Sequence, residues 1–147
     1  MQESAEENSK VVLEQEITIT RGGLFRFQIP QSIDPNTSRR WGIKCTWPLG
    51  KIVAGNGILA FTEPQPEMKL ALESAKTSLD RARVYASNGY WYDALDAYTN
   101  WIKANPNDAI AIQERGTVIE AGFEGRKGLD PKTFIAQINS ADIQEFK

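Results

Sequence analysis

The sequence has no histidine and one cysteine, Cys45. Without histidine, neither a Ser-His-Asp triad nor a Cys-His pair can form, and the commonest transition-metal ligand is missing. A single cysteine also excludes an internal disulfide and a cysteine-cluster metal site. Enzyme chemistry would have to rest on carboxylates, lysine, tyrosine or serine. We therefore expect a non-catalytic protein with no catalytic residues, cofactor or metal. An enzyme that uses carboxylates alone is the least favoured alternative.

Long apolar runs are also lacking, and so is a strong charge of either sign. No stretch is long enough to cross a membrane. The net charge of −2 gives no general attraction to nucleic acid or to an anionic membrane. Residues 1–8 are acidic and polar, without the basic start and apolar stretch of a signal peptide. We expect either a cytoplasmic protein or a mature form whose leader has been replaced by a start methionine.

The pattern of apolar residues divides the chain into a β half and a helical half. The 147 residues are 41% hydrophobic and 24% charged, which is ordinary for one globular domain. We expect a disordered arm over 1–10, a β subdomain over 11–62, a stiff proline-containing linker over 63–67 and a helical subdomain over 68–147. The predicted fold class is α+β, with a small antiparallel sheet or sandwich before the helices.

Four segments of the β half read as strands. Residues 16–20 alternate polar and apolar side chains, and 24–29 do so less cleanly. In 41–47, alternation places Trp41, Ile43, Cys45 and Trp47 on one face, which we expect to lie inward with Cys45 as a buried, inert thiol. The last strand, 52–61, contains Gly55 and Gly57, which indicate a bulge or close packing of the backbone.

In the helical half, the apolar period and the capping residues predict helices over 68–87, 91–104, about 109–121 and 131–138. Asn107-Asp108 and Asp130-Pro131 are typical helix starts, and Gly122 is a typical helix end. Residues 140–143 are expected to begin one more helical turn.

The segment from about 68 to 106 resembles one tetratricopeptide repeat. The matching residues are Ala82, Tyr85, Gly89, Ala94, Tyr98 and Pro106. Arg81 and Trp101 depart from the repeat pattern. The resemblance implies an antiparallel helical hairpin followed by a capping helix. Since a solenoid needs about three repeats to stand alone, we expect this single hairpin to pack on the β half.

A second resemblance covers about residues 17–125. It rests on the runs Gly23-Leu24-Phe25 to Ile29-Pro30, Trp41-x-Ile43-x-Cys45, Ile58-Leu59-Ala60-Phe61 and Tyr85-Ala86-x-x-Gly89-x-Trp91-Tyr92-Asp93-Ala94-Leu95. These runs resemble a mainly cyanobacterial domain-of-unknown-function family with a small β domain before a tetratricopeptide-like helix pair. The resemblance implies this architecture and, because members usually carry secretion signals, a periplasmic or extracellular location. This chain lacks the family's leader and its first strands, so we expect an unpaired sheet edge.

Positive charge gathers in the β half. Residues 17–62 carry six cations against Asp34 alone, namely Arg21, Arg26, Arg39, Arg40, Lys44 and Lys51. Two interpretations stay open: a solvated face, or a partner site for which Arg39 and Arg40 beside Trp41 are the best candidates. Residues 1–16 hold five glutamates and one lysine. We expect residues 11–20 to pair with the sheet, in the same chain or on a neighbouring copy.

The expected function is non-catalytic protein binding or scaffolding in a bacterial envelope. The concave face of the hairpin would present Lys76, Leu79, Arg83 and Ser87 to an unidentified protein partner, and Trp101 is expected to be exposed. The alternative is a structural subunit of a larger assembly whose sheet is completed by a partner's strand, including a homo-oligomer formed through the sheet edge. No nucleic-acid partner is expected.

Overall fold

A computed structural model describes residues 14–20, 23–27, 38–46, 50, 52–124, 130–141 and 143–146. The fold is mixed α+β with a small antiparallel sheet, which confirms the predicted class. In chain order the elements are β1 (Leu24–Phe27), β2 (Ser38–Thr46), β3 (Ile52–Ala60), α1 (Pro66–Ser74), α2 (Ser78–Ser87), α3 (Trp91–Ala104), α4 (Ala109–Phe123), α5 (Pro131–Ser140) and β4 (Ile143–Phe146).

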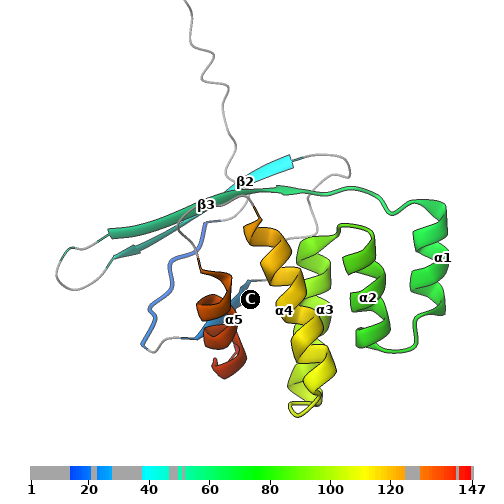
Figure 1. Cartoon of the computed structure of the whole chain (residues 1–147). Coiled ribbons are helices and arrows are strands. Elements are labelled where there is room, and N and C mark those ends of the chain that lie inside the picture. Colours follow the sequence, from blue (N-terminus) through cyan, green and yellow to red (C-terminus); the bar gives the residue numbers. More distant parts are fainter. Residues whose placement is uncertain are drawn as a thin grey trace, which may run out of the picture.

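The helices form the body of the molecule. Each of α1 to α5 packs on the next one along the chain, and Figure 1 shows them side by side. The buried apolar residues are Met68, Ala82, Ala94, Ala97, Tyr98, Ala111 and Ile119. Four of these seven are alanines, and small side chains let helices approach closely. The core therefore lies between the helices.

The helix predicted over 68–87 is two helices. Thr77 begins α2 with a capping box, because its Oγ1 accepts from the Asp80 amide at 3.0 Å and the Asp80 carboxylate accepts from the Thr77 amide at 3.0 Å. A capping box satisfies two amides that a continuous helix would use elsewhere. The single-helix prediction was wrong because the apolar period continues across this break. The hairpin is therefore α2–α3, residues 78–104, and α1 packs on α2 as a separate helix.

The turn between α2 and α3 has the features that the sequence predicts. Gly89 has φ of +78°, a left-handed conformation that suits glycine. Ala82, Ala97 and Tyr98 form a buried cluster, against which Leu79, Tyr85, Ala86 and Val118 pack. Ala94 is also fully buried. The side chains chosen from the sequence as the packing positions of the hairpin thus lie in or beside its core.

Helix α4 runs through Gly122 to Phe123 rather than ending before the glycine. A Cβ on Gly122 would lie 2.7 Å from the indole of Trp91, so the ring packs on the bare backbone there. Trp91 Nε1 also donates to the Val118 carbonyl at 2.7 Å. Gly122 is therefore a docking position for an aromatic ring, and its conformational freedom is not used to end the helix.

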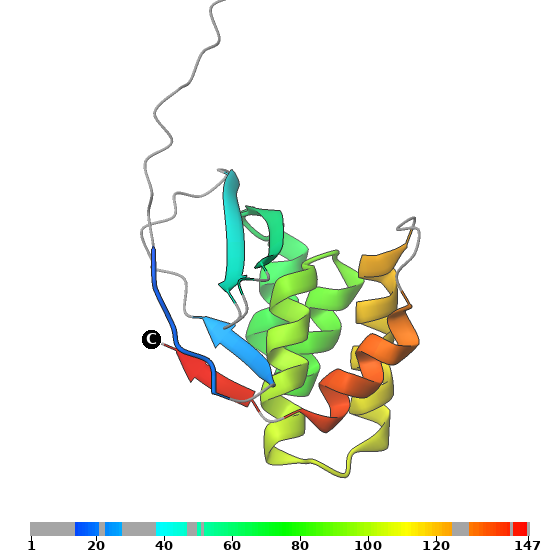
Figure 2. The ribbon, with the colours of Figure 1, turned by 90° about the vertical axis from the view of Figure 1, so that its left-hand side faces the viewer.

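The end of the chain is a strand where a helical turn was expected. Residues 143–146 form β4, which pairs in parallel with β1 in the register Leu24↔Ile143 to Phe27↔Phe146. Figure 2 shows the two strands beside each other at one side of the helices. The prediction failed because a four-residue segment is too short for its period to separate strand from helix.

The antiparallel pair is a ribbon of β2 and β3, in the register Ser38↔Ala60 to Thr46↔Ile52. In Figure 1 it extends across one end of the helical body. Residues 14–20 contain no strand, so the strand predicted over 16–20 is not formed in the single chain. The predicted ends of two other strands, at residues 28–29 and at Trp47, lie outside the described residues, as do residues 11–13 of the predicted pairing segment.

Candidate protein-binding site

One face of the β2–β3 ribbon carries apolar side chains. Trp41, Ile43 and Cys45 alternate along β2 and so share this face, opposite Gly57, Gly55 and Val53 of β3. A Cβ on Gly57 would lie 2.8 Å from the Trp41 ring, so the indole packs directly on the glycine. Gly57 thus makes room for Trp41, which is the close packing that the sequence indicated, whereas a Cβ on Gly55 would meet no atom within 4 Å.

This apolar face is exposed. Trp41 is 38% exposed and Ile43 is 48% exposed, whereas Cys45 is half-buried. Within the described chain, the extensive contacts of β2 and β3 are with each other. The prediction that this face lies inward, with Cys45 fully buried, was wrong. Alternation separates the two faces of a strand, but it does not say whether a second layer covers either one.

The opposite face is basic and also carries an exposed isoleucine. Arg40 and Lys44 share it with Ile58, which is 65% exposed. With Arg39 on the apolar face, residues 38–46 and 52–60 carry three cations and no carboxylate. None of the three forms an ion pair in the part of the chain that the structure describes. The charge of the ribbon is therefore available to a partner.

Both long edges of the ribbon are unpaired within the described residues, because the sheet has two strands in the order β2-β3. An unpaired edge presents a row of amide and carbonyl groups that another strand can pair with. A single two-stranded hairpin is marginally stable by itself. Backbone groups, exposed apolar side chains and unpaired cations thus coincide on one element.

The residues predicted on α2 are largely engaged within the chain. Leu79 packs against the core cluster, and the exposed Ser87 donates from its hydroxyl to the Val84 carbonyl. Lys76 is exposed just before α2, where its amide donates to Asp80 at 3.2 Å. Arg83 binds the Glu114 carboxylate through Nε and Nη2, each at 3.0 Å. The structure therefore brings Arg83 to α4 and does not gather the four residues into one free surface.

Arg83, Glu114 and Tyr98 join three helices. The Tyr98 hydroxyl donates to Glu114 at 3.2 Å, so α2, α3 and α4 meet at one carboxylate. Burial, with Glu114 beside it, raises the pKa of Tyr98 to about 12. Arg83 is 47% exposed and Glu114 is 32% exposed, so solvent screens the ion pair. This arrangement fixes the helices rather than forming a reactive group.

Trp101 is half-buried, contrary to the expected exposed indole. Its Nε1 donates to the Asp108 carboxylate at 2.8 Å, and Asp108 also accepts from the Ala111 amide at 3.0 Å. The bond from Trp101, followed by that from Ala111, lowers the pKa of Asp108. Trp101 therefore ties the end of α3 to the start of α4.

A polar groove of about 210 Å³ lies between α2 and α3. Desolvation, with a contribution from Asp96, raises the pKa of Asp93. Arg26 of β1 pairs with Asp96 and donates to Asn100 at 2.9 Å. Two of the polar side chains that line the groove, Asp96 and Asn100, thus bind Arg26 and hold β1 on α3. The lining residues are Ser78, Arg81, Tyr85, Asp93, Asp96, Ala97 and Asn100.

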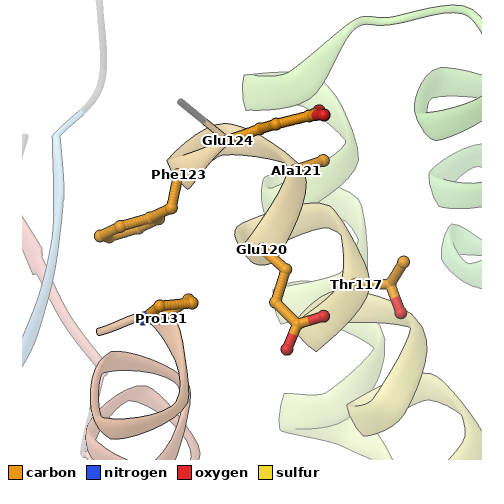
Figure 3. A pocket seen from close by; sticks show the side chains of 6 residues that line it. All are labelled: Thr117, Glu120, Ala121, Phe123, Glu124 and Pro131. Carbon is orange, nitrogen blue, oxygen red and sulfur yellow. The ribbon is translucent and has the colours of Figure 1, made fainter. Parts of the chain in front are cut away.

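A second hollow, of about 420 Å³, lies between the end of α4 and the start of α5. Figure 3 shows Phe123 above Pro131, with the side chains of Glu120 and Glu124 directed away from each other. Divergent carboxylates do not converge on a single ligand. The lining residues are Thr117, Glu120, Ala121, Phe123, Glu124 and Pro131.

Neither a metal cluster nor a membrane span is found in the described ranges. No three residues among His, Cys, Asp and Glu gather there in an arrangement that could hold a metal ion. No helix of those ranges combines the length and the apolar character that crossing a bilayer requires.

The molecule is thus a mixed α+β protein in which a helical body carries an exposed two-stranded ribbon. The family model described as Domain of Unknown Function (DUF928) matches residues 2–122, and the chain belongs to this family. The match includes the ribbon and α1 to α3, whereas α5 and β4 lie beyond it. No curated protein and no solved structure matches the chain.

Sequence reasoning selected Arg39 and Arg40 but missed the exposed isoleucines beside them. Ile43 was assigned to an inward face, and Ile58 was not selected. Gly55 and Gly57 indicated a bulge or close packing of the backbone in the last strand. The same signal could have shown that few side chains were available there to build a second layer.

Proposed function

We propose that the protein is a non-catalytic protein-binding module of a bacterial envelope, with the β2–β3 ribbon as its binding site. The observation that carries the proposal is the exposure of Trp41, Ile43 and Ile58 on a ribbon whose edges are unpaired among the described residues. Exposed apolar residues on an open sheet edge lead to association unless they are covered. The helices supply the scaffold that presents the ribbon.

The proposed mode of binding is addition of a strand to the edge of β2. Backbone hydrogen bonds supply affinity in such complexes, and alternating side chains supply specificity. An added strand would place its side chains opposite Arg39, Arg40 and Lys44, so carboxylates at those positions are favoured. The partner is therefore a protein with an acidic, extended segment rather than a nucleic acid.

A second candidate function is that of a structural subunit whose ribbon is permanently completed by another subunit. The same unpaired edge supports it. The two functions differ in the oligomeric state of the isolated chain. A structural subunit is oligomeric or aggregates when isolated, whereas a binding module is monomeric until its partner is added. In both, α2–α3 serves as a tetratricopeptide-like support for the ribbon.

The proposed location is periplasmic or extracellular, and the proposed origin is cyanobacterial. The support is the resemblance carried by the Trp41-x-Ile43-x-Cys45 strand and the Trp91 to Leu95 run. The location is tested by fractionating cells that express the protein from its native gene. Recovery with the cytoplasm would contradict it.

A displayed library of linear peptides, selected on the full chain, tests the function. We expect the enriched peptides to alternate apolar residues with Asp or Glu, because these complement the two faces of β2. Ile43→Ser removes an exposed apolar contact and Arg40→Glu reverses a charge. Each should weaken peptide binding roughly tenfold, the scale of one interface contact worth more than 1 kcal/mol.

The control variants are Lys76→Gln and Ser87→Ala, since both residues are exposed, Lys76 just before α2 and Ser87 at its end, and α2 makes no extensive contact with β2 or β3. Binding should be unchanged in them. Peptides that lose affinity with the α2 variants and keep it with the ribbon variants would place the binding site on the helical hairpin. Circular dichroism verifies that each variant remains folded.

A further inference from the structure

Residues 14–20 have the composition of a strand but form none in the single chain. Ile17, Thr18, Ile19 and Thr20 are all β-branched, a type enriched in strands. Ile19 is 46% exposed, and Glu14 and Glu16 are exposed as well. In Figures 1 and 2 the segment runs along the side of the molecule that carries the strands, away from α1 and α2. The chain thus presents an exposed, acidic and apolar segment in addition to an exposed, basic and apolar ribbon.

The segment and the edge of β2 have matching patterns. Thr18 lies between Ile17 and Ile19, just as Gly42 lies between Trp41 and Ile43. If Thr18 pairs with Gly42, both isoleucines fall on the face of Trp41 and Ile43, whichever way the added strand runs. Glu16 then lies opposite Arg40 in a parallel pairing or opposite Lys44 in an antiparallel one. Either direction pairs a carboxylate with a cation.

We propose that residues 14–20 of a second copy of this chain add to the β2 edge as a third strand. The inference rests on the proposed function and names the partner at the same site. A second copy is favoured over the chain's own segment because the single chain forms no ladder between 14–20 and β2. Contact between two β2 edges is disfavoured because it would bring Arg39, Arg40 and Lys44 of both copies together.

The β2 edge is favoured over the β3 edge for the same reasons. Residues 52–60 carry no charge and include Gly55 and Gly57. An added strand there would find no cation for Glu14 or Glu16. The apolar and basic partners of the segment both lie on β2, so one edge alone satisfies the whole pattern.

The proposed ion pairs are tested by reversing the charges on the segment and on β2 and measuring association by analytical ultracentrifugation. The wild-type chain should associate as its concentration rises. Glu16→Lys and the double variant Arg40→Glu/Lys44→Glu should each remove that association, because each juxtaposes like charges. Mixing the two variants should restore association, because the lysine of one copy then meets the glutamates of the other. A wild-type chain that is monomeric at all concentrations would overturn the proposal, and so would a mixture that stays monomeric.

Disulfide trapping tests the register. Thr18→Cys and Gly42→Cys are made on separate chains in a Cys45→Ser background. A Cβ on Gly42 has room, since the nearest atom is the Gly55 carbonyl oxygen at 3.8 Å. Adjacent strands lie about 4.8 Å apart, within the Cα separation of about 7 Å that a disulfide tolerates. The mixed chains should therefore oxidise to a covalent heterodimer as the main product.

The matched control is Asn56→Cys, which lies opposite Gly42 but on β3. It is one strand farther from the added segment, at about 10 Å, so it should not be trapped by Thr18→Cys. Equal trapping at Asn56 and Gly42 would overturn the register. In a chain carrying both Thr18→Cys and Gly42→Cys, an intramolecular disulfide without dimer would show that the segment binds its own ribbon, which overturns the second copy as partner.

This outcome is separable from the proposed function. If library peptides bind the ribbon while the chain neither associates nor forms the heterodimer, the site is right and the occupant is another protein. If peptides do not bind the ribbon either, both proposals fail.

Discussion

Two tryptophans pack on the bare backbone of a glycine, and this contact recurs in both halves of the molecule. Trp41 lies on Gly57 in the ribbon, and Trp91 lies on Gly122 between α3 and α4. In each, a Cβ would come within 2.8 Å of the ring. These glycines are therefore needed for space and not for a left-handed backbone conformation, which is the reason for Gly89.

The two glycines of α4 predict opposite effects of alanine. Gly122→Ala should lower the free energy of unfolding by about 1–3 kcal/mol, because its methyl group overlaps the Trp91 indole. Gly116→Ala should raise it by about 0.5–1 kcal/mol, because alanine favours the helix and its Cβ would meet Ile135 at an ordinary 3.6 Å. Urea unfolding measures both. A Gly122→Ala protein as stable as Gly116→Ala would contradict the docking of Trp91.

At the scale of single residues, the sequence predicted a residue's role correctly where that role depends on nearby residues in the chain. Gly89 turns the chain, and Ala82 and Tyr98 pack in the hairpin, as the resemblance to a tetratricopeptide repeat implied. The sequence did not predict the role of a residue that contacts an element far away in the chain. Gly122 looked like a helix end because its tryptophan is 31 positions away in sequence.

Capping side chains at the N-terminal ends of three helices fix where these helices begin. Thr77 with Asp80, Asp108 and Asp130 each accept backbone amides at the start of α2, α4 and α5. Thr77→Ala removes one side of the capping box at α2. We expect a loss of about 1 kcal/mol in the free energy of unfolding, which is typical of a lost N-cap. Serine at the same position is the control and should keep most of the stability. Equal stability of the alanine and serine variants would contradict the capping role.

The same caps predict a loss of stability in acid. Hydrogen bonds from the Thr77 side chain and then its amide lower the pKa of Asp80 below its usual 3.8. The folded state therefore binds fewer protons than the unfolded state near that pH. The contribution of Asp80 is present above about pH 4 and is lost as the pH falls through the lowered pKa. Asp108 and Asp130, with pKa values also lowered, act in the same direction.

Urea unfolding from pH 6 to pH 2 measures this effect in the wild type and in Asp80→Asn. The wild type should lose stability below about pH 4 more steeply than Asp80→Asn, because asparagine does not titrate there. Parallel curves would show that the Asp80 carboxylate is not engaged in the cap.

The elements were predictable where a period persists for several turns. Helices α3, α4 and α5 fall close to their predicted ranges, since each has an apolar period, and α4 and α5 also begin at a capping aspartate. The break before α2 was missed because the capping residues sit inside a continuous apolar period. β4 was missed because its partner, β1, is more than a hundred residues earlier in the chain.

The whole molecule is a helical body with a ribbon that makes few contacts with it among the described residues. The sequence predicted an unpaired sheet edge, and among the described residues β2 and β3 form a sheet of two strands. Arg39 and Arg40, selected together from the sequence, lie on opposite faces of β2. The sequence could not predict that the Trp41 face is exposed. Alternation along one strand is the same whether the apolar face meets a core or meets solvent, and only the tertiary arrangement distinguishes these cases.

Backbone hydrogen exchange, measured by mass spectrometry at two protein concentrations, tests the exposed β2 edge most directly. In dilute protein, the amides of β2 should exchange well before those of α3, because a two-stranded ribbon opens locally at little cost. Raising the concentration should slow exchange in β2 and in residues 14–20, and should leave α3 unchanged. Amides of β2 as protected as those of α3 in dilute protein would show that the ribbon is covered within its own chain, and would contradict its role as a binding site.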